Sequence, residues 1–116
     1  MQKFSAKQGS RFPVEKKYKL RYLELAQSDL LDIVSYIGNQ LSAPQAAANL
    51  VDKLDKAISR LERYPFSGAP YLKKQKLEDE YRFLVVEDYL VFYVVDDSVV
   101  EIRRIIYGRR NYTGLL

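Results

Sequence analysis

The chain has 116 residues, which fits a single globular domain, and 47% of them are hydrophobic, enough to form a core. It contains no cysteine, which excludes disulfides and thiolate metal sites, and no histidine, which excludes imidazole as catalyst or ligand. Any chemistry must come from carboxylate, lysine, arginine, tyrosine or hydroxyl groups. We expect neither a metal nor another cofactor.

The net charge of +4 is distributed unevenly along the chain. Residues 1–23 hold seven Lys or Arg against one acid, residues 102–116 hold four arginines and no acid, and the stretch between them is acidic. If the first and last strands lie close together, the two basic ends form one surface that attracts phosphate. A solvated basic surface without a ligand explains the same pattern.

No segment has the features of a membrane span or a secretion signal. The longest apolar run, residues 89–95, is far too short to cross a bilayer as a helix. Residues 1–5 lack the apolar stretch of a signal peptide. We therefore expect a cytoplasmic protein.

The first half of the chain predicts one strand and two helices after a flexible extension, residues 1–17. Residues 18–23 alternate, with Tyr18, Leu20 and Tyr22 on one face, which is typical of a half-buried strand. Apolar residues then recur at three- and four-residue steps in two stripes, 26–41 and 47–61, which predict an antiparallel helical hairpin.

Local signals refine the second helix. Ser42 and Gln45 are placed as a capping box around Pro44 in the first turn. Asp52 and Lys56 form an i,i+4 pair on the exposed side. The helix must end before Pro65, because a residue that precedes proline avoids helical geometry.

The second half predicts a three-stranded antiparallel meander after a loop that contains Pro65, Gly68 and Pro70. Three β-rich runs, 81–86, 89–95 and 99–107, are separated by very short turns. The middle run is apolar on both faces, which indicates a central strand covered on both sides. In the last run, simple alternation places Ile102, Arg104 and Ile106 on one face and their neighbours on the other.

The complete order is β-α-α-β-β-β, an α+β domain over residues 18–116 with the helical hairpin packed on an antiparallel sheet. This order, the Pro-Gly-Pro loop, the Tyr81-Arg82 pair that opens the meander and the closing Tyr-Gly-Arg-Arg-Asn-Tyr at 107–112 together resemble the RelE/ParE toxins of type II toxin–antitoxin systems. The pattern of Ala26, Asp29 and Leu30 in the first helix is also similar to members of this family.

The resemblance implies an antitoxin partner and one of two activities. RelE-like members cut mRNA on the ribosome, and ParE-like members inhibit DNA gyrase without chemistry of their own. Cleavage of RNA by its 2′-hydroxyl needs a base, cations for the developing phosphorane charge and a proton donor to the leaving oxygen. We expect this chain to be a ribonuclease of the RelE-like kind. A ParE-like gyrase inhibitor is the alternative, and a toxin without activity is a third possibility.

By position in the family pattern, Arg82 and Arg110 would clamp the scissile phosphate, since the guanidinium fork binds two phosphate oxygens. Tyr112 would stack on a base or donate a proton, and Lys73 or Lys74 would serve as base if neighbouring cations lower its pKa. We also expect an RNA-binding surface of four basic residues: Lys76, Arg103, Arg104 and Arg109. Asn111 stands where some relatives carry a histidine, so a histidine mechanism is excluded.

Each of these residues also has a purely structural interpretation. Arg82 pairs with Glu80 or Glu101 across strands, Arg110 is a solvated charge, and Tyr112 packs to hold the C-terminus. The acidic runs 78–80 and 96–97 are candidates for a metal site, but a strand entry and a hairpin turn explain them better. The antitoxin is expected to supply an acidic disordered segment that folds over the helix edges and covers the arginines.

Overall fold

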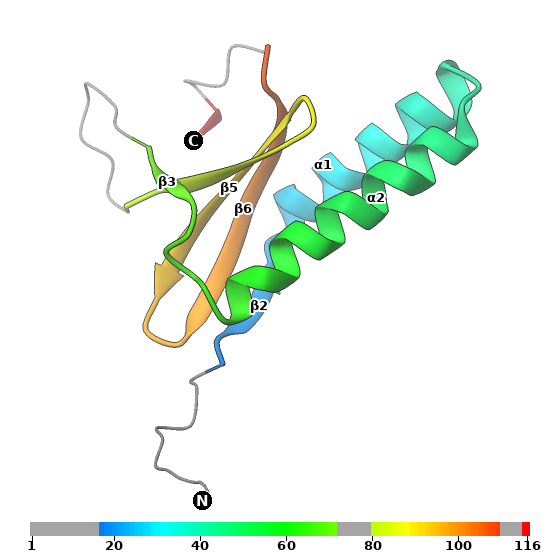
Figure 1. The fold of residues 1–116 in the computed structure, drawn as a ribbon. Coiled ribbons are helices and arrows are strands. Elements are labelled where there is room, and N and C mark those ends of the chain that lie inside the picture. Colours follow the sequence, from blue (N-terminus) through cyan, green and yellow to red (C-terminus); the bar gives the residue numbers. More distant parts are fainter. Residues whose placement is uncertain (1–16, 72–79, 110–114) are drawn as a thin grey trace, which may run out of the picture.

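The computed structural model describes residues 17–71, 80–109 and 115–116. Two helices cover one face of a five-stranded sheet, and their hairpin extends past the end of the sheet (Figure 1). The strands are β2 (Lys19–Tyr22), β3 (Ala69–Pro70), β4 (Arg82–Val86), β5 (Tyr89–Asp96) and β6 (Val99–Tyr107). This is the predicted α+β class, with the short β3 as an added strand.

The strand order is β2-β6-β5-β4-β3, so the sheet joins the first and last long strands. The meander β4-β5-β6 is antiparallel, as its short turns predict. β2 pairs with β6 in parallel, with Lys19 opposite Val99 and Tyr22 opposite Ile102. The sheet is therefore mixed rather than purely antiparallel, because the helical hairpin carries the chain back before the meander begins.

The helical hairpin consists of α1 (Glu24–Ser35), a π-helical segment (Tyr36–Gln40), α2 (Pro44–Ser59) and a final 3₁₀ turn (Arg60–Glu62). It ends before Pro65, and Asp52 and Lys56 form the predicted ion pair. The predicted capping box is wrong. Ala43 is the N-cap of α2 and no side chain caps it, because Ser42 adopts a left-handed φ of 51° and Gln45 bonds to Asn49 instead.

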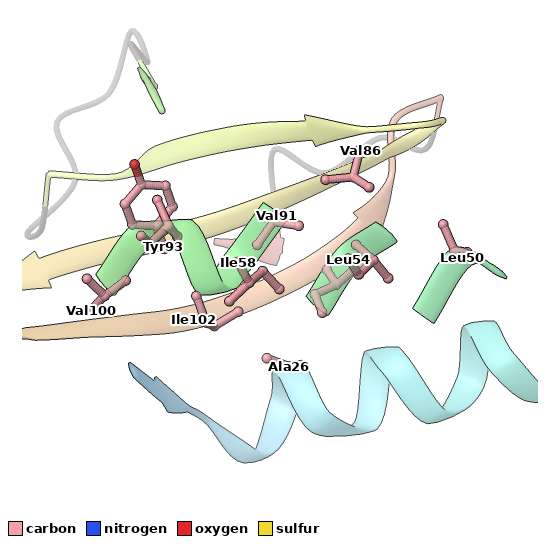
Figure 2. Close-up of a cluster of buried hydrophobic side chains, with 11 residues drawn as sticks. Ala26, Leu50, Leu54, Ile58, Val86, Val91, Tyr93, Val100 and Ile102 are labelled. Carbon is pink, nitrogen blue, oxygen red and sulfur yellow. The ribbon is translucent and has the colours of Figure 1, made fainter. Parts of the chain in front are cut away.

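The main core lies between the hairpin and the sheet (Figure 2). Leu54, Ile58 and Leu61 are at most 2% exposed, and they pack on the sheet residues Val91, Val100 and Ile102. Leu20 and Tyr22 of β2, and Tyr18 just before it, join this core, as the alternation of residues 18–23 predicts. Burial of these apolar side chains is the main force that holds the hairpin on the sheet.

A second, smaller core covers the other face of the central strand. Tyr81, Phe92, Val94 and Ile106 are buried there, and Leu115 and Leu116 pack against them. The rings of Tyr71 and Phe83 approach that of Phe92 with centroid distances of 5.4 and 5.9 Å. This second cover explains why β5 is apolar on both faces.

A β-bulge in β6 overturns the simple alternation predicted for this strand. Phe92 of β5 is opposite Arg104 and Tyr93 is opposite Ile102, so Arg103 is an extra residue between them. Ile102 therefore packs in the main core, whereas Ile106 packs in the second core. The extra residue reverses the face of every side chain that follows it.

Among residues 17–71, 80–109 and 115–116, no helix is long and apolar enough to cross a membrane.

Candidate functional site

The residues predicted to act on RNA are only partly within the described chain. Lys73, Lys74, Lys76, Arg110 and Tyr112 lie outside it. Arg82, Arg103, Arg104 and Arg109 lie inside it, and they occupy β4, β6 and the turn after β6. The contacts and exposure of these four arginines show whether the sheet presents cations that a phosphate could reach.

Arg82 holds the loop that follows the helical hairpin. Its Nη1 donates hydrogen bonds to the carbonyl oxygens of Phe66 at 3.3 Å and Gly68 at 2.8 Å. The guanidinium carbon also lies 5.1 Å from the centre of the exposed Phe66 ring, a cation–π contact. The expected pair with Glu80 or Glu101 is not among the contacts of Arg82 with the described residues.

Tyr93 fixes the same loop from inside the core. Its buried hydroxyl donates to the carbonyl of Pro65 at 2.8 Å and accepts from the Gly68 amide at 2.9 Å. Burial raises the pKa of Tyr93, partly offset by the Gly68 hydrogen bond and the charge of Arg82. Arg82 and Tyr93 thus hold the Pro65–Gly68 loop at the start of β4, which keeps the Arg82 guanidinium in one place.

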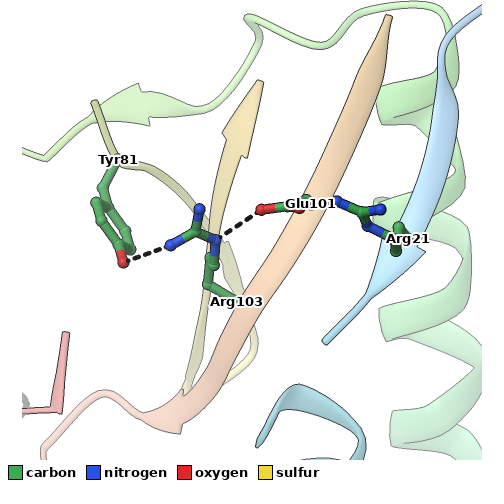
Figure 3. A network of polar contacts seen from close by, with 4 residues as sticks. All are labelled: Arg21, Tyr81, Glu101 and Arg103. Atoms are coloured by element: carbon green, nitrogen blue, oxygen red, sulfur yellow. Dashed lines mark hydrogen bonds and ion pairs between the residues drawn. The ribbon is translucent and has the colours of Figure 1, made fainter. Parts of the chain in front are cut away.

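Arg103 belongs to a chain of polar contacts across the second face of the sheet (Figure 3). Its Nε donates to Glu101 at 2.9 Å and its Nη1 to the Tyr81 hydroxyl at 3.1 Å, while Arg21 of β2 bonds the same carboxylate. Glu101 is only 12% exposed, and the Arg21 hydrogen bond, followed by Arg103, holds its pKa below the usual value. The two arginines are therefore neutralised in part by one partly buried carboxylate.

Arg104 forms a two-pronged ion pair with Asp29 of α1. Its Nε and Nη2 donate to the two carboxylate oxygens at 2.8 and 2.9 Å, and both side chains are 14% exposed or less. Asp29 also accepts from the Ile105 amide, and Arg104 Nη1 donates to the Leu115 carbonyl. The Asp29 hydrogen bond raises the pKa of Arg104. This pair joins α1, β6 and the C-terminal residues.

Arg109 lies in the turn after β6 and is exposed. The turn is closed by a hydrogen bond of 2.7 Å from the Gly108 amide to the Asp88 carbonyl. Arg109 is thus the exposed member of the four, whereas Arg82, Arg103 and Arg104 each bind other parts of the chain.

Sequence reasoning missed the acceptors that engage these arginines. Asp29 belongs to the family-like pattern of the first helix and Glu101 is a possible cross-strand partner of Arg82, but nothing local in the sequence indicates that they bind Arg104 and Arg103. Tyr93 carried one usable signal, since a tyrosine in the middle of a central strand must find a buried partner for its hydroxyl. Among the described residues, no three acidic side chains lie close enough together to hold a metal ion.

Comparisons with known proteins agree with this architecture. The model of the ParE toxins of type II toxin–antitoxin systems, parDE, matches residues 20–112. No curated protein matches the sequence.

Several solved structures share the fold, and three of them show the range of similarity. The chromosomal ParDE system from P. aeruginosa aligns with a TM-score of 0.64 at 20% identity, over 79% of this chain and 97% of that chain. The RelBE2 complex from Mycobacterium tuberculosis gives 0.53 at 23% identity, over 78% and 91%. The E. coli DinJ–YafQ complex gives 0.53 at 12% identity, over 86% and 98%. Because the family model covers most of the chain and the fold agrees, this chain belongs to the ParE toxin family of type II toxin–antitoxin systems.

Proposed function

We propose that this toxin inhibits growth by binding DNA gyrase, without RNA cleavage, and that a cognate antitoxin neutralises it. The observation that carries the proposal is the engagement of the sheet arginines. Arg103 and Arg104 bind Glu101 and Asp29, so two of the cations expected to face phosphate stabilise the fold instead. If Arg104 turned toward a phosphate, the partly buried carboxylate of Asp29 would keep only the Ile105 amide as a donor, which is costly.

The comparisons support the same choice. The matching family is described by its parDE systems, and the structure with a TM-score of 0.64 is a ParDE system. The three similar structures named above come from toxin–antitoxin systems, which supports an antitoxin as the partner of this chain.

One observation favours the ribonuclease as a second candidate. Arg82 uses a single nitrogen, Nη1, for both of its loop contacts. Within the described residues, its Nε and Nη2 make no hydrogen bond, so the guanidinium still offers donors for a phosphate. Arg82 would then act with Arg110, Tyr112 and Lys73 or Lys74.

The test is induction of the full chain in bacteria, with plasmid supercoiling and gyrase–DNA breaks measured beside the positions of mRNA ends. We expect gyrase–DNA breaks and mRNA that lacks codon-phased cuts. The matched variants are Arg82→Lys, which keeps the charge but loses the planar fork, and Arg110→Ala. Both should remain toxic if binding to gyrase is the activity.

Codon-phased mRNA cuts that disappear in both variants, with intact supercoiling, would overturn the gyrase proposal and establish the ribonuclease. Purified chain added to gyrase in a supercoiling reaction gives an independent readout, because that reaction contains no ribosome. Inhibition there supports direct binding, and full gyrase activity at high toxin concentration contradicts it.

A further inference from the structure

A groove of about 890 Å³ opens between the outer part of the helical hairpin and the end of the sheet formed by the β4–β5 turn and the end of β6. Its apolar lining includes Ile33, Ile37 and Leu50 from the helices and Tyr89 and Ile105 from the sheet. Its rim is also apolar: Tyr36, Leu41 and Tyr107 are 51%, 55% and 41% exposed. An apolar surface of this kind is typical of a site for another segment of protein.

The charges around the groove are mainly negative. Four carboxylates and one ammonium group line it. Asp29 is bound by Arg104 and Glu87 by Lys53, at 2.8 Å in each case. Asp32 and Asp88 remain exposed, and neither forms an ion pair with the described residues. The occupant that fits this groove is therefore apolar and basic.

Residues 1–16 of the same chain have this composition. They contain Lys3, Lys7, Arg11 and Lys16 against the single acid Glu15, together with the apolar residues Phe4, Phe12 and Val14. The other two segments outside the described chain fit less well. Residues 72–79 carry three lysines against two acids, and residues 110–114 carry a single charge.

The segment is long enough to reach the groove. It joins the described chain at Lys17, two residues before Lys19, which lies opposite Val99 at the start of β6. From Val99 to the groove residue Tyr107 the strand covers about 26 Å at about 3.3 Å per residue. Residues 1–16 span about 53 Å when extended at about 3.3 Å per residue, roughly twice that distance.

We propose that residues 1–16 bind in this groove of their own chain, with their phenylalanines on its apolar lining and their basic residues near Asp32 and Asp88. The contact covers the open side of the helical hairpin. It does not depend on the proposed action on gyrase, since it follows from the groove, its charge and the composition of the segment.

The absence of cysteine makes the test direct, because a single introduced cysteine can be labelled without background. The full chain carries Gln8→Cys with a nitroxide, and the NMR signals of the groove residues are recorded with the label oxidised and reduced. We expect the oxidised label to cause loss of the amide signals of Tyr36, Asp88 and Tyr107. Signals at the far end of the sheet, such as Val99, should keep their intensity.

Charge reversal then identifies the contacts. Asp32→Lys with Asp88→Lys should restore the lost signals, and adding Lys7→Glu with Arg11→Glu should make them disappear again. The matched control is Asp52→Lys with Asp96→Lys, which changes the net charge equally at exposed positions outside the groove lining. This control should leave the signal loss unchanged. The remaining spectrum of each variant shows whether it is folded.

Three results would overturn the proposal. One is the absence of signal loss in the groove with the label at position 8. Another is signal loss that the control pair, Asp52→Lys with Asp96→Lys, reduces as much as the groove pair, Asp32→Lys with Asp88→Lys. The third is signal loss that disappears when the nitroxide-labelled chain is mixed with chain that carries no nitroxide, and when the protein concentration is lowered. The segment would then occupy the groove of a second copy.

Discussion

Arg103 and Arg104 of β6 have fixed partners because each is bound to a carboxylate that the fold largely removes from water. Asp29 and Glu101 are both 13% exposed or less. A carboxylate at that depth needs several hydrogen bonds, and the guanidinium group supplies them in a planar array. Asp29 accepts from Arg104 and the Ile105 amide, and Glu101 accepts from Arg21 and Arg103. These arginines therefore stabilise the contacts of β6 with its neighbours.

We expect Glu101→Gln to lower the free energy of unfolding at neutral pH by about 1–3 kcal/mol, because two charged hydrogen bonds are weakened. The pKa of Glu101 is lowered in the folded state, chiefly by the Arg21 hydrogen bond. Its stabilisation is therefore present above the unfolded pKa and is lost as the pH falls through the lower folded pKa.

The measurement is urea unfolding of both proteins between neutral and strongly acidic pH. The difference between them should shrink on acidification below the usual pKa of a glutamate. Glu80→Gln, at an exposed position, is the control and should change little. A difference that stays constant with pH would contradict the role of the charged carboxylate.

At the scale of elements, the loop between the helical hairpin and the sheet depends on close packing at Gly68. A Cβ atom there would lie 2.5 Å from the Tyr93 hydroxyl and 2.8 Å from the Phe83 carbonyl oxygen. Both atoms are fixed by strands, so the loop would have to move. Such a move would also break the hydrogen bonds of Gly68 with Tyr93 and Arg82.

Gly68→Ala should therefore destabilise the protein by about 1–3 kcal/mol. In a Tyr93→Phe background Gly68→Ala should lower the free energy of unfolding by less, because the nearest obstructing atom, the Tyr93 hydroxyl oxygen, is gone. The losses of stability from the two single substitutions should therefore not add. Urea unfolding of the two single variants and the double variant measures this coupling.

Gly38→Ala is the matched control, since its new Cβ would meet only Ala47 at 3.8 Å, an ordinary contact. It should be close to neutral. Additive costs for Gly68→Ala and Tyr93→Phe would show that the hydroxyl does not restrict the loop.

At the scale of the whole molecule, the sheet has two covered faces of different kinds. The helices cover one face continuously, whereas Tyr71, Tyr81 and the last two leucines cover part of the other. Arg104 connects the two covers, because it binds Asp29 of α1 and the carbonyl of Leu115.

Replacement of both Leu115 and Leu116 by serine should lower the free energy of unfolding by about 1–3 kcal/mol, because half-buried apolar contacts with the second core are lost. Binding of a hydrophobic dye should increase at the same time, since the aromatic residues of that core become accessible. The control is Leu31→Ser, at a side chain that is 69% exposed. Equal unfolding midpoints for the double variant and the original chain would contradict a structural role for the C-terminal leucines.

The sequence by itself determined the two helices, the four longer strands, their order and the family. Hydrophobic period is a local property, so the stripes on α1 and α2 and the runs of β4, β5 and β6 could be found from neighbours along the chain. The buried positions of Leu54 and Ile58 follow from the same period. Because the run that forms β5 is apolar on both faces, the sequence also predicted that both faces of the sheet are covered.

Only the tertiary structure decided what the arginines do. The carboxylate that binds Arg104 belongs to Asp29, 75 residues away in the chain. The carbonyl groups that bind Arg82 lie 14 and 16 residues away. A flexible side chain with several donors gives no local sign of which acceptor it binds. The bulge at Arg103 changed which face its neighbours occupy, and the parallel pairing of β2 with β6 brought Arg21 to Glu101. The sequence supplied the charges. The packing of α1 on β6 brought Asp29 to Arg104, and the pairing of β2 with β6 added Arg21 to Glu101, because a carboxylate withdrawn from water must find its hydrogen-bond donors within the protein.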